Sequence, residues 1–168
     1  KANTMPPADG KDRMEMCRLA FGSIPVCEVS DYEISKGGVS YTAVTLEDLR
    51  EIYPGDRLIL TVGSDSLESL PRWHRAGDII KTAEIAAAAR SDEDMGRING
   101  YADNIRRLGG VVHIIKTRPF DISSTEIREK ILNNQDISCY IEEDVVKYIM
   151  CNKIYRNGDS FGCSDVQC

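Results

Sequence analysis

Three hydroxyl side chains and an arginine surround the expected start of a short helix, at Ser123, Ser124, Thr125 and Arg128. Ser123 and Glu126 have the spacing of a capping box, in which a hydroxyl and a carboxylate each accept a backbone N–H. The dipole at a helix start favours an anion and disfavours a cation as close as Arg128. A phosphate chain at the helix start would be favoured by the dipole, and it would offset the unfavourable position of the Arg128 cation, whose guanidinium could hold it. Taken alone, these residues favour the alternative, an ordinary capped helix with a solvated arginine.

A second group of candidates follows the apolar run Leu58–Val62, which predicts a buried strand. Gly63 makes the expected turn into a short helix, and Asp65 lies just beyond it. Ligands of doubly wound sheets bind beyond the carboxyl ends of the strands. Asp65 is placed to accept hydrogen bonds from a ribose or a base, or to cap the helix; the sequence supports both interpretations about equally.

The single tryptophan, Trp73, lies in a loop-like segment after Pro71, next to His74. An indole in such a loop can stack on a flat ligand ring. A core anchor between helices is at least as well supported. His74 could interact with an anion, although a lone histidine more often has no such role.

Hydrophobic periodicity predicts the elements that would position these residues. Strands are expected at Pro25–Val29, Leu58–Val62, Ile85–Ala89 and Val111–Ile115, with His113 structural. Helices are expected at Asp12–Phe21, Gly77–Thr82, Ser91–Leu108 with breaks near Gly96 and Gly100, and Glu142–Met150. Another should follow Ser40-Tyr41-Thr42 and end at Pro54-Gly55, and the helix after Ser123 should stop at Asn133-Asn134. This alternation predicts one α/β domain over residues 1–156 with a mostly parallel sheet, followed by a polar tail at 157–168.

The composition and charge of the chain argue against several classes of function. The chain has 168 residues, 42% of them hydrophobic, and a net charge of −6, which argues against binding nucleic acid or a membrane surface. No apolar run is long enough to span a bilayer, and no signal peptide is recognisable. The six cysteines form no C-x-x-C pair. Free thiols in a cytoplasmic protein are therefore expected.

Four motifs together resemble the nicotinate mononucleotide adenylyltransferases. Ile122–Arg128 resembles the family's I-S-S-T-x-I-R, and Ser40-Tyr41-Thr42 resembles the start of its S-Y-T-x-x-T-L. Gly63–Leu67 is similar to G-A-D-S-L, and Leu70–Trp73 to L-P-x-W. Their order and spacing agree over almost the whole chain. The resemblance implies a Rossmann-like nucleotidyltransferase fold, a parallel sheet flanked by helices.

The resemblance also implies an activity and a site. Such enzymes transfer the adenylyl group of ATP to nicotinate mononucleotide, normally with Mg²⁺, and release deamido-NAD and pyrophosphate. The implied ATP-binding residues are Gly63, Asp65, Ser123, Ser124, Thr125 and Arg128, with Ser124 and Arg128 as the catalytic pair. The implied residues for the pyridine nucleotide are Trp73, against the ring, and Thr42 and His74, near its carboxylate. No metal-ligating residue is implied, and a homo-oligomer stays open.

The chain also departs from the family pattern. It lacks the segment G-G-x-F-D-P-x-H-x-G-H, and Ala8 stands where the family has a histidine after two prolines. We therefore expect an amino-terminally incomplete copy without its first two strands and with little activity. Two alternatives are another nucleotidyltransferase of the same fold, such as one acting on phosphopantetheine, and a non-catalytic nucleotide-binding module. A dehydrogenase is disfavoured because no G-x-G-x-x-G follows a strand.

Overall fold

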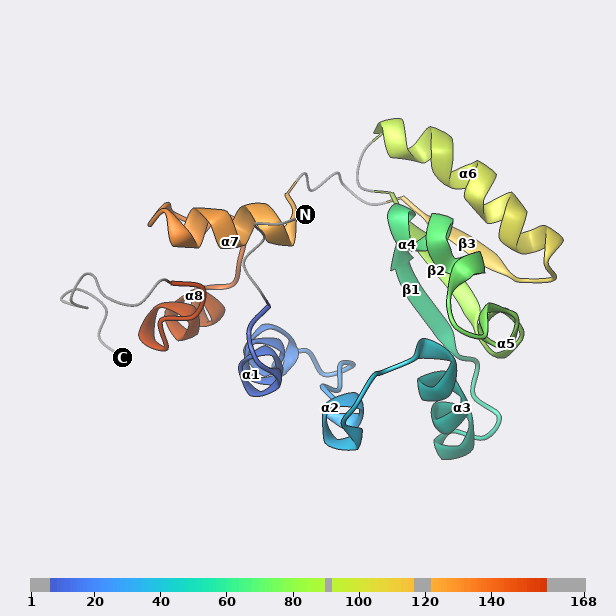
Figure 1. The fold of residues 1–168 in the computed structure, drawn as a ribbon, viewed down its shortest axis with the longest axis horizontal. Coiled ribbons are helices and arrows are strands. Elements are labelled where there is room, and N and C mark those ends of the chain that lie inside the picture. The colour runs from blue at the N-terminus through green and yellow to red at the C-terminus, as the bar shows by residue number, and fades with distance from the viewer. Residues whose placement is uncertain (1–6, 90–91, 117–121, 157–168) are drawn as a thin grey trace. The chain divides into compact units, whose positions relative to one another are not determined.

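A computed structural model of the chain describes residues 7–89, 92–116 and 122–156 (Figure 1). They belong to two compact units, each with its own hydrophobic core. The first unit comprises Lys1–Lys36 and Ile122–Cys168, and the second comprises Gly37–Asp121. The expected tail at 157–168 lies outside the described residues.

A parallel sheet forms the centre of the second unit. Its strands, in the order β1-β2-β3, are β1 (Ile59–Gly63), β2 (Glu84–Ala88) and β3 (Val112–Ile115). Its helices are α3 (Thr42–Ile52), α4 (Ser64–Ser69), the 3₁₀ helix η1 (Leu70–Arg72), α5 (Ala76–Thr82) and α6 (Asp92–Arg107). Val62 pairs with Ala87, and Ala87 with Ile114. The predicted α/β architecture with a parallel sheet is confirmed.

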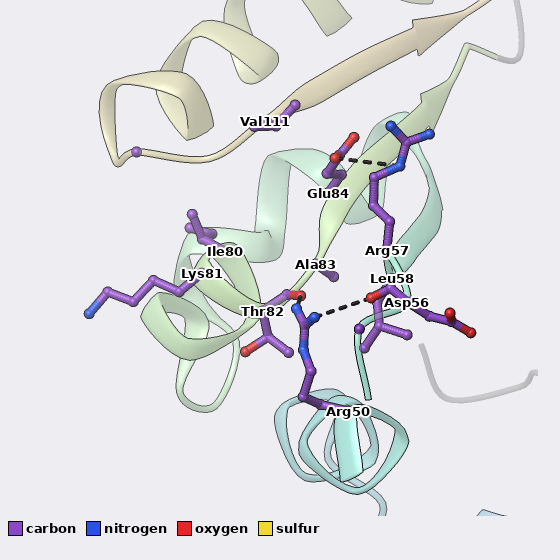
Figure 2. A pocket seen from close by; sticks show the side chains of 12 residues that line it. Arg50, Asp56, Arg57, Leu58, Ile80, Lys81, Thr82, Ala83, Glu84 and Val111 are labelled. Atoms are coloured by element: carbon purple, nitrogen blue, oxygen red, sulfur yellow. Dashed lines mark hydrogen bonds and ion pairs between the residues drawn. The ribbon is translucent and has the colours of Figure 1, made fainter. Parts of the chain in front are cut away.

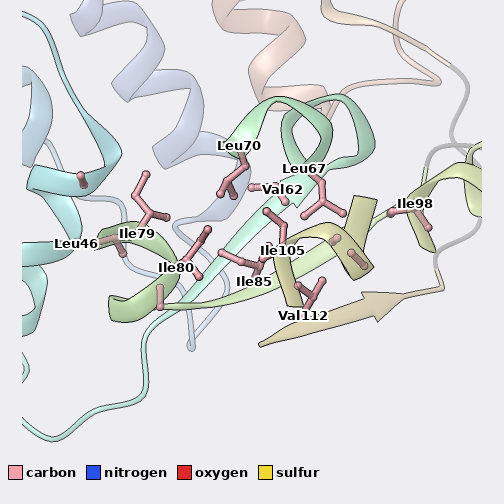
Figure 3. Close-up of a cluster of buried hydrophobic side chains, with 14 of the residues drawn as sticks. Leu46, Val62, Leu67, Leu70, Ile79, Ile80, Ile85, Ile98, Ile105 and Val112 are labelled. Carbon is pink, nitrogen blue, oxygen red and sulfur yellow. The ribbon is translucent and has the colours of Figure 1, made fainter. Parts of the chain in front are cut away.

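One face of this sheet packs on the core of the unit (Figure 3). Side chains alternate between the two faces of a strand, and Val62, Ile85 and Val112 are buried on the same face. The expectation that the whole run Leu58–Val62 is buried is wrong, because Ile59 and Thr61 of the edge strand β1 are exposed. Leu67, Leu70, Ile98 and Ile105 from the helices complete the core.

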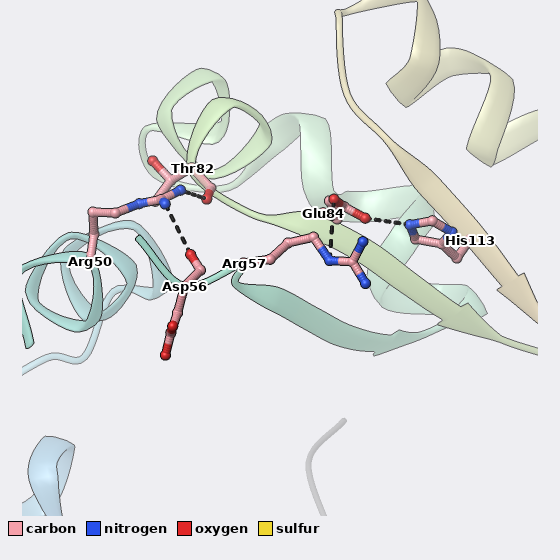
Figure 4. Close-up of polar contacts among 6 residues, drawn as sticks. All are labelled: Arg50, Asp56, Arg57, Thr82, Glu84 and His113. Atoms are coloured by element: carbon pink, nitrogen blue, oxygen red, sulfur yellow. Dashed lines mark hydrogen bonds and ion pairs between the residues drawn. The ribbon is translucent and has the colours of Figure 1, made fainter. Parts of the chain in front are cut away.

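Polar contacts join the elements near the amino ends of the strands (Figure 4). Arg50 of α3 donates to the carbonyl oxygens of Thr82 at 2.7 Å and Asp56 at 3.1 Å. His113 Nε2 lies 2.5 Å from the Glu84 carboxylate of the neighbouring strand, in agreement with the structural role predicted for this histidine. These contacts tie α3, α5 and the sheet edge together.

The described helices of the first unit are α1 (Gly10–Phe21), α2 (Tyr32–Lys36), α7 (Ser124–Leu132) and α8 (Glu143–Cys151). Its core consists of the buried side chains Ile131, Ile137, Val145, Ile149 and Ile154. The Tyr148 hydroxyl donates to Asp12 at 2.9 Å and so connects α8 to α1. Residues far apart in the sequence therefore form one compact unit.

Two predicted elements are wrong. Pro25–Val29 is not a strand: residues around it form turns, with Cys27 N donating to Ile24 O, and Val26 is 92% exposed. A proline has no N–H for a ladder, and no described strand pairs with the segment. The helix expected at Ser91–Leu108 has no break, and α6 is continuous over its length. Burial of its inner face outweighs the propensity cost of about 1 kcal/mol for each of the two glycines.

The cysteines differ partly from expectation. Cys17, Cys27 and Cys139 are free and exposed, as expected. Cys151, however, is disulfide-bonded, so the expectation of free thiols is wrong for this residue. Within the described part of the chain, every helix is too short or too polar to cross a bilayer.

Helix α7 allows a direct test of the first unit's core. Ile131 is fully buried, whereas the next residue, Leu132, is 37% exposed. We expect Ile131→Ala to lower the free energy of unfolding by about 2–5 kcal/mol, because it removes buried methyl groups and leaves a cavity. Leu132→Ala is the matched control and should cost less than about 1 kcal/mol. Urea unfolding followed by circular dichroism measures both, and equal losses would contradict this packing.

Candidate active site

The predicted capping box at the start of α7 is confirmed. Glu126 N donates to Ser123 Oγ at 3.1 Å, and Ser123 N donates to Glu126 Oε2 at 2.6 Å. These hydrogen bonds from Ser123 hold the pKa of the Glu126 carboxyl below its usual value, so the carboxylate is charged at neutral pH. The helix ends at Leu132 with Asn133 as its cap, as the sequence predicts.

Arg128 folds back toward the start of the same helix. Its Nη2 atom donates to Thr125 Oγ1 at 3.3 Å. Its Nε is buried and has no hydrogen-bond partner among the described residues. A buried donor without an acceptor is costly. The guanidinium of the half-buried Arg128 is therefore incompletely satisfied beside Thr125 and the exposed Ser124.

At the carboxyl end of β1, the chain turns directly into α4. Gly63 is the N-cap of this helix, which has no side-chain cap. Asp65 lies exposed in the first turn, two residues after Gly63, so it is not the N-cap residue of α4. The buried Ser64 donates to Asp94 of α6 at 2.6 Å. This contact fixes the start of α4 against α6.

The loop after η1 carries Trp73 and His74. Trp73 is half-buried against the core of the second unit, and its Nε1 donates to Ser69 Oγ at 3.0 Å. The ring of His74 lies 4.3 Å from the ring of Tyr41, centroid to centroid. Tyr41 is the N-cap of α3 and makes no side-chain capping bond. The structure thus brings His74 to the helix start that contains Thr42.

The predicted site residues fall into the two units. Those at the start of α7 belong to the first unit, and Thr42, Gly63, Asp65, Trp73 and His74 belong to the second. Sequence reasoning did not single out Ser64 and Asp94, although Ser64 lies inside the predicted turn. The contact between them joins residues 30 positions apart, which no local pattern reveals.

An open pocket of about 540 Å³ in the second unit lies away from these residues (Figure 2). Arg50, Arg57, Lys81 and Glu84 are among its lining residues, and none of the predicted site residues is. It lies at the amino ends of the strands, whereas ligands of such sheets bind beyond the carboxyl ends. We therefore do not assign it to the active site.

Comparisons with known proteins agree with the motifs. The cytidylyltransferase-like family model matches residues 1–130. A probable nicotinate-nucleotide adenylyltransferase of Dehalococcoides mccartyi is 35% identical, over 90% of this chain and 74% of the relative. Another, of Methylacidiphilum infernorum, is 33% identical over 89% of this chain and 69% of the relative.

Solved structures match the fold at lower identity. Plasmodium falciparum nicotinic acid mononucleotide adenylyltransferase complexed with NaAD has a TM-score of 0.66 and 17% identity, over 91% of this chain and 76% of that chain. The same enzyme complexed with APC has a TM-score of 0.65 and 18% identity, over 87% of this chain and 74% of that chain. The structural likeness supports the nucleotidyltransferase fold, and the sequence matches show that the chain belongs to the cytidylyltransferase-like family and, within it, to the nicotinate-nucleotide adenylyltransferases.

Proposed function

We propose that this protein transfers the adenylyl group of ATP to nicotinate mononucleotide, a step of NAD biosynthesis. A phosphate oxygen of the mononucleotide attacks the α-phosphorus of ATP, the bond to the β-phosphate breaks, and pyrophosphate leaves with deamido-NAD as the product. The reaction needs no covalent intermediate with the protein. It needs aligned substrates and groups that stabilise charge on the transferring phosphorus.

The start of α7 carries this proposal, because its groups fit a polyphosphate. Arg128 has a buried Nε without a partner among the described residues, and an anion would satisfy it. The hydroxyls of Ser124 and Thr125 and the helix dipole also favour an anion there. We infer that Ser123, Ser124, Thr125 and Arg128 hold the ATP phosphates, with Ser124 and Arg128 closest to the reaction.

The second unit supplies candidates for the rest of both nucleotides. The uncapped start of α3 at Thr42, with His74 close to Tyr41, suits the nicotinate carboxylate. We propose that Trp73 stacks on the pyridine ring, and that Gly63 and Asp65 meet the adenosine part of ATP. The family's motifs, rather than any distance between the units, assign both sets of residues to the same two substrates.

Mg²⁺ belongs to the proposal as a companion of ATP. The described residues contain no group of three acidic, histidine or cysteine side chains that could hold a metal ion. Mg²⁺ is often bound largely by substrate phosphates, and there it would neutralise phosphate charge. We also propose a cytoplasmic location, because Cys17, Cys27 and Cys139 are exposed free thiols, the disulfide-bonded Cys151 being the exception.

The reaction itself is tested by pyrophosphate release. We expect turnover to be low, as the departures from the family pattern imply, and pyrophosphate to be released from ATP only when nicotinate mononucleotide is present, together with formation of deamido-NAD. Phosphopantetheine in place of the mononucleotide should give none. Release with phosphopantetheine but not with the mononucleotide would assign the chain to a different nucleotidyltransferase reaction.

Arg128→Ala should weaken ATP binding and leave nicotinate mononucleotide binding nearly unchanged. Loss of one charge-assisted contact costs about 1.5–3 kcal/mol, which corresponds to a rise in Kd of about 10- to 150-fold. Titration calorimetry with a non-hydrolysable ATP analogue measures it. Lys130→Ala is the control of equal charge change on the same helix. An ATP affinity equal to wild type in Arg128→Ala would exclude the phosphate role.

Trp73 reports on the pyridine site because it is the single tryptophan of the chain. We expect nicotinate mononucleotide to quench its fluorescence, since stacking on the pyridine ring brings the two π-systems together. Trp73→Ala should raise KM for this substrate while KM for ATP stays within about twofold. If the variant unfolds and the wild-type fluorescence does not respond, Trp73 is only a core anchor.

A further inference from the structure

Arg75, next to His74, has an unusual backbone conformation. Its φ is 55° and its ψ is 41°, in the left-handed region. The other non-glycine residues with positive φ in the described segments are Asn134, Lys153 and Tyr155. Asn134 and Lys153 directly follow the C-caps of α7 and α8, where left-handed residues commonly end helices, and Tyr155 lies two residues further on. Arg75 instead begins a helix, α5, and such a conformation persists only where the surroundings enforce it.

Two carboxylates hold the Arg75 side chain. Its Nη1 donates to Glu47 Oε2 at 2.9 Å, and its Nη2 donates to Glu47 Oε1. Its Nε donates to Asp78 Oδ2 at 2.6 Å. Glu47 belongs to α3 and Asp78 to α5, so a single guanidinium joins two helices through a planar, two-pronged contact.

These contacts fix the loop that carries the candidate pyridine-binding residues. His74 packs on Tyr41 at the start of α3, and Arg75 is bonded to Glu47 further along the same helix. On the other side, Trp73 is hydrogen-bonded to Ser69. The loop is thus attached to α3 at two points and to α4 at one.

We propose that Arg75 is a positioning residue for the pyridine nucleotide: its paired contact with Glu47 holds Trp73 and His74 in the conformation that receives nicotinate mononucleotide. The inference rests on the proposed function. Arg75 acts through its neighbours, because each of its three guanidinium nitrogens donates to Glu47 or Asp78, which holds the side chain in the contact between α3 and α5. The role requires a planar fork, so lysine should not replace it.

The expected effect is moderate. The side chains of Arg75 and Glu47 are 39% and 46% exposed, and exposed ion pairs contribute little individually. The apparent affinity of a ligand falls in proportion to the fraction of protein in the binding conformation. If loss of the contact leaves about one loop in five correctly placed, KM for nicotinate mononucleotide rises about fivefold.

Two variants separate this role from backbone strain. Arg75→Gly removes the side chain and also relieves the positive φ, while Glu47→Gln weakens the same contact from α3 and leaves the loop sequence unchanged. Asp103→Asn is the control, because it removes another exposed arginine pair, with Arg106 on α6, at 2.9 Å. Arg75→Lys tests the requirement for the fork.

Steady-state kinetics and acrylamide quenching of Trp73 give two readouts. For Arg75→Gly, Glu47→Gln and Arg75→Lys we expect KM for nicotinate mononucleotide to rise about fivefold, with kcat and KM for ATP within twofold. Trp73 in the substrate-free protein should become more accessible to acrylamide. Asp103→Asn should match wild type in both readouts.

Three results would overturn the inference. The first is an active wild type with unchanged KM in Arg75→Gly and Glu47→Gln. The second is an equal rise in both KM values together with a lower melting temperature, which indicates general destabilisation. The third is an inactive wild type, which overturns the proposed function and the substrate role of Arg75 with it; the acrylamide measurement then still decides whether Arg75 orders the loop.

Discussion

Backbone N–H groups left unpaired at helix starts are the constraint on which the candidate site depends. The first turn of any α-helix lacks intrahelical acceptors for its N–H groups. The starts of α3 and α4 have no side-chain cap, and α7 has a capping box. Each of the three starts carries a predicted ligand contact, at Thr42, Asp65 and Ser124. The chain therefore presents partial positive charge near Thr42 and Ser124, where the nicotinate carboxylate and the ATP phosphates are expected.

Local chemistry explains which parts of the fold could be predicted from the sequence. The capping box and the end of α7 follow from the positions of Ser123, Glu126 and Asn133, because capping involves residues a few positions apart. The strand at Pro25–Val29 was wrongly predicted because a short apolar run does not reveal whether a partner strand exists. Helix propensity alone predicts breaks near the two glycines of α6. It takes no account of the burial of Ile98 and Ile105, which are both fully buried and favour a continuous helix.

For the candidate site, the motifs of the sequence indicate which residues belong to it. They do not indicate the contacts that hold these residues in place, because those contacts join distant parts of the chain. Ser64 with Asp94, and Arg75 with Glu47, are separated by 30 and 28 positions. The left-handed conformation of Arg75 was equally hidden, since glycine or asparagine is the residue that usually indicates it. Long-range hydrogen bonds thus decide features that no local pattern encodes.

Charge poses a final question, because both substrates are anionic and the chain has a net charge of −6. Screening limits the repulsion: the Debye length is about 8 Å at physiological ionic strength, so distant exposed carboxylates act weakly. The charges close to the bound phosphate then determine whether it is attracted or repelled. At the start of α7, the Glu126 carboxylate stays charged because backbone and hydroxyl donors of Ser123 hold it, and the positive end of the helix dipole offsets part of this charge. Arg128 keeps a buried Nε with no acceptor among the described residues. A charge close to a phosphate interacts with it more strongly than distant, screened carboxylates do, so Arg128 can favour an anion at the start of α7 in spite of the net charge of the chain.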